Sequence, residues 1–156
     1  EAKSNWDDNM LSHTCKAAVK AVLYLATRAN TGNKSGIKEI AEAIKASEHT
    51  SAKMLQLLAK REIIHSVKGP TGGFYISNEQ LHQAVINIVT AIDGPAIFHE
   101  CGLGLSTCSE THPCPIHDQY KVAREIIRDL FQQTTIQTLA QKLESGDAFI
   151  SDKILL

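Results

Sequence analysis

Apolar residues in the first part of the chain recur at the spacing of amphipathic helices and are separated by short polar turns. Over residues 11–29 they fall three or four positions apart, which predicts a first helix that the TGNKSG segment at 31–36 ends. A shorter run over 37–44 predicts a second helix, and a third follows from about 48 to 60 after a tight turn at 46–47. Two short helices joined in this way are typical of a helix-turn-helix unit.

The pattern then changes from helical spacing to that of a hairpin. β-Branched and aromatic residues at 63–67 and 74–76 flank the segment 68–73, KGPTGG. Glycine supports the positive φ angles of a tight turn, so these residues predict a β-hairpin with a glycine-rich tip. A helix, a helix-turn-helix and a hairpin in this order form a winged helix.

The second half of the chain predicts further helices around one irregular segment. A connecting helix is expected over 79–95, ended by Asp93-Gly94-Pro95, whereas 96–114 shows no period. A long helix then starts at Pro115, and a short final helix ends near 143. The apolar stripe of the long helix consists of Ile116, Tyr120, Ala123, Ile127, Leu130 and Phe131. Because this stripe is longer than one small core can cover, we expect it to be the interface of a homodimer.

The predicted fold is mainly α with a small β-hairpin wing. It consists of a winged helix-turn-helix DNA-binding domain at 10–78, a connecting helix at 79–95, a cysteine-rich sensor loop at 96–114, a dimerisation helix with a short final helix at 115–143, and a tail at 144–156. We interpret the polar residues 1–9 as a tag remnant or disordered arm.

Composition narrows the class of protein. The 156 residues are 43% hydrophobic and 21% charged, which excludes wholesale disorder, and no apolar run approaches the roughly 20 residues that span a bilayer. Four cysteines are too few for a disulfide scaffold, so we expect a cytoplasmic protein without membrane contact. The net charge of −1 divides into −2 over residues 1–9, +6 over 10–78 and −5 over 79–156. This asymmetry favours contact between the N-terminal half and a polyanion.

The third helix and the hairpin are therefore expected to bind double-stranded DNA, at a roughly palindromic operator if the protein is a two-fold dimer. Small polar side chains on the third helix could reach base edges, and cations there and on the hairpin could bind phosphates. The candidate DNA-binding residues are His49, Thr50, Ala52, Lys53, Lys60, Arg61, Lys68, Gly69, Thr71 and Gly72.

The irregular segment holds three of the four cysteines. Cys101, Cys108 and Cys114 are separated by six and then five residues, and His117 follows three positions later. Buried structural cysteines usually lie on periodic apolar faces, as Cys15 does on the first helix, so three thiols in one loop favour metal ligation. They suit an iron-sulfur cluster or a zinc ion, with His117 as the candidate fourth ligand. Unligated thiols and a redox disulfide are the alternatives.

Four segments carry a family resemblance: LSHTCKAAVKAVLYLA, IKEIAEAIKAS, LQLLAKREIIHSVKGPTGGFYI and INIVTAIDG. Together they resemble the Rrf2 (Rrf-two) family of bacterial winged helix-turn-helix transcription regulators, in particular its IscR/NsrR-like members. The resemblance covers residues 10–143, and the SVKGPTGGFYI hairpin is its most specific part.

The resemblance implies a homodimer whose loop binds a [2Fe-2S] or [4Fe-4S] cluster that responds to redox state, nitric oxide or iron, and that aerobic preparation can remove. Family members with such clusters usually have five residues in each gap between the cysteines, whereas the first gap here has six. In some of them an acidic residue on the first helix of the partner completes the site; the matching position here is Lys16.

Two other functions fit the same residues. One is the same regulator without a cluster, responding to thiol oxidation, a small ligand or a partner protein. The other is a metal- or thiol-dependent enzyme with His117 as a base. The sequence offers no nucleophile paired with a base and an orienting acid, and an enzyme would leave the wing without a purpose, so we expect no enzymatic activity.

Overall fold

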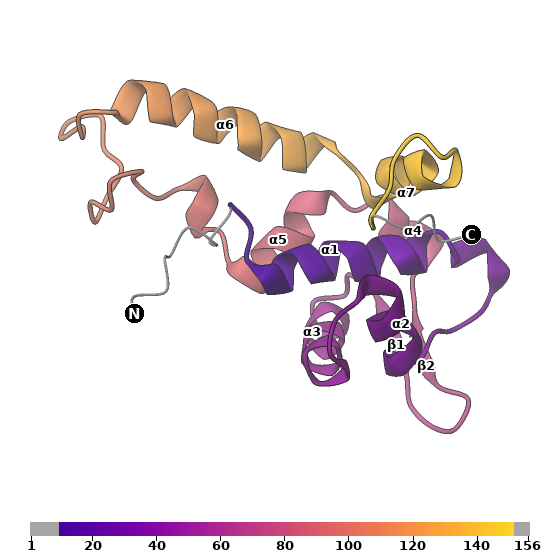
Figure 1. Cartoon of the computed structure of the whole chain (residues 1–156). Helices are drawn as coiled ribbons and strands as arrows, with labels where there is room; N and C mark the ends of the chain where they lie inside the picture. The colour runs from indigo at the N-terminus through magenta and orange to yellow at the C-terminus, as the bar shows by residue number, and fades with distance from the viewer. Residues whose placement is uncertain (1–9, 152–156) are drawn as a thin grey trace.

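The computed structural model describes residues 10–151 and is shown in Figure 1. Its helices are α1 (His13–Ala26), α2 (Ile37–Ile44), α3 (Glu48–Lys60), α4 (Asn78–Leu81), α5 (Val85–Asp93), α6 (His117–Gln133) and α7 (Ile136–Glu144), with short 3-10 turns η2 (Ala29–Thr31) and η3 (Ala96–Phe98). One antiparallel hairpin consists of β1 (His65–Val67) and β2 (Gly73–Tyr75). The mainly helical fold with a β-hairpin wing is as the sequence predicts.

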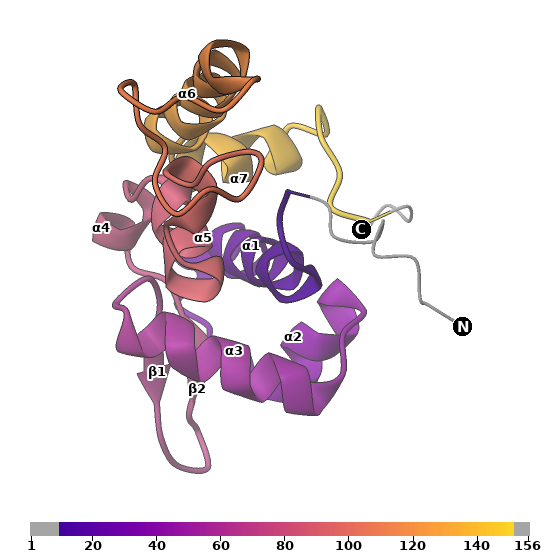
Figure 2. The same ribbon diagram turned by 90° about the vertical axis from the view of Figure 1, so that its left-hand side faces the viewer.

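Helix α1 lies at the centre of the molecule and contacts α2, α3, α5 and α7. The main core forms around it because its buried residues, which include Ala18, Val22 and Leu25, meet Ile40 of α2 and Leu58 of α3. In Figures 1 and 2 the helix-turn-helix and the hairpin lie on one side of α1, and α6 lies on the opposite side. The DNA-binding elements and the long helix therefore occupy opposite faces of one body.

The helix-turn-helix follows the predicted boundaries because local residues determine them. Lys45 ends α2 in the left-handed conformation, at φ 55°. Ser47 then caps α3, since its side-chain oxygen accepts a hydrogen bond from the backbone N–H of Thr50 at 3.1 Å. The turn between the two helices is thus as tight as the sequence indicated.

The hairpin is joined by a third chain segment at its base. Ser35 and Phe74 form an isolated antiparallel bridge, in which each backbone N–H donates to the carbonyl oxygen of the other residue at 2.9 Å. At the tip, a Cβ on Gly72 would lie 2.1 Å from the carbonyl oxygen of Val67, so no larger residue fits there. The wing is therefore tied to the segment between α1 and α2.

The prediction of one connecting helix over 79–95 is wrong in one respect, because the segment forms two helices, α4 and α5. Ser77 and Gln80 form a capping box that starts α4, which ends at Leu81. Ala84 is extended and bridges to Thr135, and the N–H of Val85 donates to the carbonyl oxygen of Thr134 at 2.9 Å. These long-range hydrogen bonds replace the helical ones and break the helix.

A second, smaller core joins α6 to the rest of the molecule. Cys15 of α1, Val89 of α5 and Phe98 of η3 are buried together, and Ile127 and Phe131 of α6 pack against them. The long helix begins at His117, two residues later than the sequence suggested, because Ile116 is not helical. Within residues 10–151, no helix is long and apolar enough to cross a membrane.

Candidate DNA-binding face and cysteine loop

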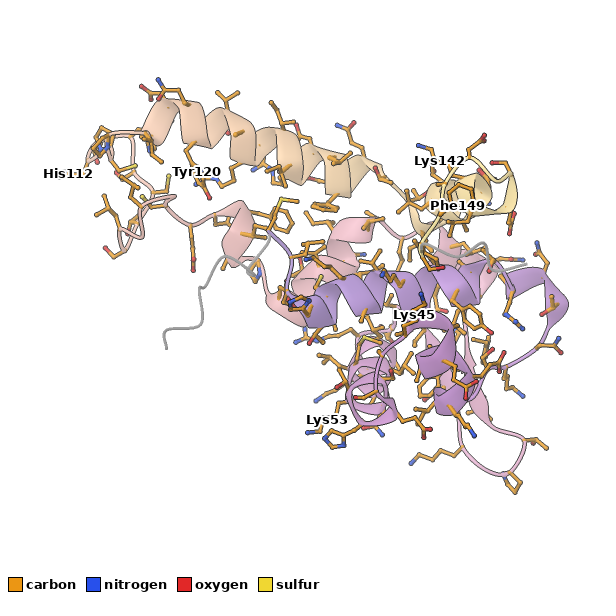
Figure 3. The ribbon with its side chains drawn as sticks, in the orientation of Figure 1. Lys45, Lys53, His112, Tyr120, Lys142 and Phe149 are labelled. Carbon is orange, nitrogen blue, oxygen red and sulfur yellow. The ribbon has the colours of Figure 1, made fainter. Side chains whose placement is uncertain are left out.

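The outer face of α3 carries the polar residues that the sequence singled out. His49, Thr50 and Lys53 are exposed, and Figure 3 shows Lys53 pointing away from the body of the molecule. Ala52 is half-buried, and Met54 and Leu55 on the other side of the helix are in the core. The face is free to approach a nucleic acid.

The remaining candidates extend this surface to the wing. Lys60 and Arg61 are exposed at the C-terminal end of α3, and Lys68 and Thr71 are exposed in the hairpin loop. The two glycines of that loop support its turn: Gly69, at φ 106°, is exposed, and Gly72 is half-buried. The exposed cations therefore lie at the C-terminal end of α3 and in the hairpin loop that follows it.

The three loop cysteines are free thiols in different surroundings. Cys101 and Cys114 are buried and interact with each other, whereas Cys108 is half-buried. Hydrogen bonds from backbone N–H groups, including that of Leu103 at 3.4 Å, lower the pKa of the Cys101 thiol. Burial raises the pKa of Cys114. The two thiols therefore differ in acidity, and Cys101 is the more acidic.

His117 brings a fourth donor to the loop. Its Nδ1 lies 3.4 Å from the Sγ of Cys108, and its buried Nε2 has no hydrogen-bond partner within the described part of the chain. A buried ring nitrogen without a partner is unusual and suits a ligand. The position at the first residue of α6 agrees with the sequence, which placed His117 close to Cys114.

Among the four donors, Cys108 contacts His117, and Cys114 interacts with both Cys101 and Cys108. Among residues 10–151, no group of three cysteine, histidine or acidic side chains lies close enough together to hold a metal ion. The donor types nevertheless fit a cluster, because thiolates are its usual ligands and imidazole replaces a thiolate in some clusters. The loop therefore has the ligand types of a cluster site, but its four donors are not gathered around one point.

Contacts that the sequence did not reveal hold the loop on α6. The guanidinium of Arg124 donates to the carbonyl oxygen of Glu100 at 2.7 Å, and Lys121 pairs with Glu110. The ring of Tyr120 lies against Gly102, where a Cβ would come within 2.7 Å of the ring. In Figure 3 Tyr120 lies on the side of α6 that faces the loop, and His112 lies at the far end. Only the spacing of these α6 residues, three, four and seven positions after His117, could have suggested their shared face.

The apolar residues of α6 divide between two faces. Tyr120, Ile127 and Phe131 are half-buried and turn toward their own chain, whereas Ile116, Ala123 and Leu130 are exposed. The sequence interpretation missed Val122 and Ile126, which are 57% and 64% exposed. With Leu130, at 58%, they form a row at positions i, i+4 and i+8, hereafter the outer row.

Cys15 is a core thiol, as its place on the first helix indicated. It is fully buried, and burial with the nearby carboxylate of Asp93 raises its pKa to about 12. Asp93 also accepts hydrogen bonds from the N–H of Ser12, at 2.9 Å, and from its hydroxyl. The last residue of α5, just before the cysteine segment, is thereby tied to the N-terminus of α1.

Comparison with known proteins identifies close similarities along most of the chain. The model of the Rrf2 family, described as an iron-dependent transcriptional regulator, matches residues 11–142. A proposed HTH-type transcriptional regulator of Aquifex aeolicus is 32% identical over 132 residues, which are 83% of this chain and 90% of that protein.

Solved structures share the fold at lower identity. The structure of CymR, the global cysteine regulator of B. subtilis, has a TM-score of 0.69 at 18% identity and covers 84% of this chain and 95% of its own. T. potens IscR has a TM-score of 0.66 at 21% identity, covering 89% of this chain and 91% of its own. Both have the winged-helix architecture described above.

Proposed function

Because the chain belongs to the Rrf2 family of transcriptional regulators, which bind DNA and are not enzymes, we propose that it is a homodimeric regulator whose cysteine loop binds an iron-sulfur cluster. The observation that carries the cluster assignment is His117. Its Nε2 is buried without a partner beside three free thiols in one loop. Cys101, Cys108 and Cys114 would be the thiolate ligands, with His117 the fourth.

DNA binding is assigned to the outer face of α3 and to the wing. His49, Thr50 and Ala52 would approach base edges in the major groove, and Lys53 a base or a phosphate. The remaining candidates, Lys60, Arg61, Lys68, Gly69, Thr71 and Gly72, would bind the backbone. A two-fold dimer would present two such faces, which favours a roughly palindromic operator.

The dimer is assigned to α6 and in particular to the outer row. Val122, Ile126 and Leu130 leave an apolar strip without cover in the described chain. A second copy of α6 would bury this strip symmetrically, as isologous interfaces do. Of the interface residues that the sequence suggested, three are exposed: Ile116, Ala123 and Leu130. The other three, Tyr120, Ile127 and Phe131, are half-buried against their own subunit.

The contacts around the loop support a route from the cysteines to the DNA-binding half. Phe98 lies three residues before Cys101 and is buried beside Cys15 of α1. Asp93, which ends α5 just before the same segment, accepts hydrogen bonds from Ser12 at the N-terminus of α1. When bound, a cluster supplies iron-thiolate bonds that oxidants, nitric oxide or iron shortage can break. A change in the loop would then displace Phe98 and Asp93, and through them α1 and α3.

Purification without oxygen, followed by iron and sulfide analysis with visible absorbance, tests the cluster. We expect wild type to carry iron and sulfide, and Cys101→Ala, Cys108→Ala and Cys114→Ala to lose them. Cys15→Ala is the matched control, because that thiol lies in the core and should leave the iron content unchanged. If reconstituted wild type holds no iron and sulfide, the cluster assignment is wrong; if only His117→Ala keeps both, the fourth ligand is wrong.

The contact between Cys101 and Cys114 favours one second candidate, a regulator that senses oxidation directly. Hydrogen peroxide would oxidise the two thiols to a disulfide and would be reduced to two water molecules. Mass spectrometry of the cluster-free protein would then find this disulfide, with a change in DNA affinity that dithiothreitol reverses. The same cluster-free protein with unchanged affinity would exclude this mode of sensing.

A further inference from the structure

A cleft with both polar and apolar lining lies on the side of the wing away from α3. Its volume is about 350 Å³, and it lies where the end of α1 and the segment before α2 meet the exit of β2. Its lining includes Arg28, Asn33, Lys34 and Asn78. None of these residues belongs to the DNA-binding set that the sequence suggested.

The polar lining of the cleft offers hydrogen-bond donors and no carboxylate. Lys34 has no ion-pair partner within residues 10–151, and the side-chain amides of Asn33 and Asn78 are exposed. Arg28 is partly neutralised, because its Nη1 lies 3.3 Å from the Oε1 of Glu39, outside the lining. An ammonium, two amides and a guanidinium around one hollow favour an anion, and phosphate oxygens fit donors of these types.

The cleft is held to the wing as one unit. Ser35, directly after Lys34, forms two hydrogen bonds of 2.9 Å with the backbone of Phe74 in β2. A Cβ on Gly73 would lie 3.1 Å from the Cβ of Lys34, so the two chains are in close contact. In Figure 1 the segment between α1 and α2 runs beside the hairpin. The cleft therefore keeps a fixed position relative to the hairpin.

We propose that the cleft binds a backbone phosphate of the operator just outside the base pairs covered by α3 and the wing, with Lys34, Asn33 and Asn78 as its donors. This proposal rests on the proposed function, since it requires a duplex bound through α3 and the hairpin. The contact fixes the register of the protein and widens its footprint without reading sequence. A free phosphate ion presents the same oxygens, so the experiment must separate the two sources.

The test compares salt dependence on two duplexes. On a duplex that extends well beyond the half-sites, Lys34→Ala should make the slope of log K against log salt shallower by about 0.9 per subunit, or about 1.8 for a dimer. On a duplex cut back to the base pairs beneath the wing, Lys34→Ala and wild type should bind equally. Lys34→Arg should keep the wild-type slope. Lys142→Ala is the control, because Lys142 lies on α7, far from the wing in Figure 3.

Each other outcome overturns the assignment in a distinct way. Equal slopes for wild type and Lys34→Ala on the long duplex exclude the phosphate contact. A loss that persists on the short duplex places Lys34 within the half-site and excludes the flanking contact. Inorganic phosphate that shifts the side-chain amide NMR signals of Asn33 and Asn78, with no effect of Lys34→Ala on DNA, assigns the cleft to a free anion. If wild type binds neither duplex, the proposed function itself fails.

Discussion

Two neighbouring isoleucines of α6 should respond in opposite ways to the same substitution. Ile126 belongs to the outer row and is 64% exposed, whereas Ile127 packs against the core of Cys15, Val89 and Phe98. We expect Ile126→Glu to yield a folded monomer, because the carboxylate stays in water when the partner leaves. Ile127→Glu should instead destabilise the subunit, because it places an unpaired charge against buried apolar groups.

The size of the effect follows from exposure. Full burial of an isoleucine side chain contributes about 1.5–3 kcal/mol, so covering the exposed part of Ile126 contributes roughly 1–2 kcal/mol in each subunit. Because the substitution is present in both subunits, the dimer loses roughly 2–4 kcal/mol of association free energy. At 1.4 kcal/mol per factor of ten, the dimer Kd should rise roughly 30- to 700-fold. For Ile127→Glu a loss of about 3 kcal/mol would lower Tm by roughly 6–12 °C.

Light scattering after size-exclusion chromatography at micromolar concentration measures the first effect. Wild type should have about twice the 17.1 kDa mass of the chain, and Ile126→Glu should have that mass alone with an unchanged circular dichroism spectrum. Gln132→Glu adds the same charge to an exposed site of α6 outside the outer row and should remain a dimer. A wild-type monomer, or a dimeric Ile126→Glu, would refute the assignment of the outer row.

Three further outcomes are expected. Cys15 should resist iodoacetamide in the native protein at pH 8, because burial and the carboxylate of Asp93 raise its pKa to about 12; peptide mass spectrometry that finds it alkylated as fast as in urea would contradict this. Gly102→Ala should reduce iron incorporation, because its Cβ would collide with the ring of Tyr120, and Tyr120→Leu in the same chain should restore part of it; additive losses would exclude that contact. Lys68→Ala should weaken DNA binding about equally on specific and non-specific duplexes, as measured by fluorescence anisotropy, whereas a loss confined to the operator would mean that Lys68 reads bases.

The elements that the sequence predicted well are those with local determinants. Ser47 caps α3 through its own neighbour Thr50, and Gly94 ends α5 at φ 80°, so a few adjacent residues decide where each helix starts or stops. The break between α4 and α5 depends on the bridge of Ala84 to Thr135, which lies far away in the sequence. No local pattern around Ala84 signals that bridge.

In the cysteine loop and on α6, too, local sequence identifies the residues, whereas their contacts depend on distant parts of the chain. Residue type and spacing are enough to single out Cys101, Cys108, Cys114 and His117, but the pairs that the structure places in contact depend on how the loop folds over α6. Helical periodicity identifies α6 as amphipathic and places Ile127, but not Ile126, on the stripe expected at the dimer interface, whereas Ile127 packs against the core of its own subunit. Because Ile126 and Ile127 are adjacent and identical in type, only the packing of Phe98 beneath the helix decides which of them faces the core.

The central claim is that the state of the cysteine loop controls binding of DNA. The most direct measurement is the operator Kd of one anaerobic sample before and after its iron is removed by a chelator and reductant, with the dimer mass and circular dichroism followed in parallel. A change in Kd of at least tenfold is predicted, with the dimer and its helical content retained, and with Cys114→Ala fixed at the iron-free value. Equal Kd values for the iron-loaded and iron-free dimers would contradict the claim, since a ligand without differential affinity for two states shifts no equilibrium.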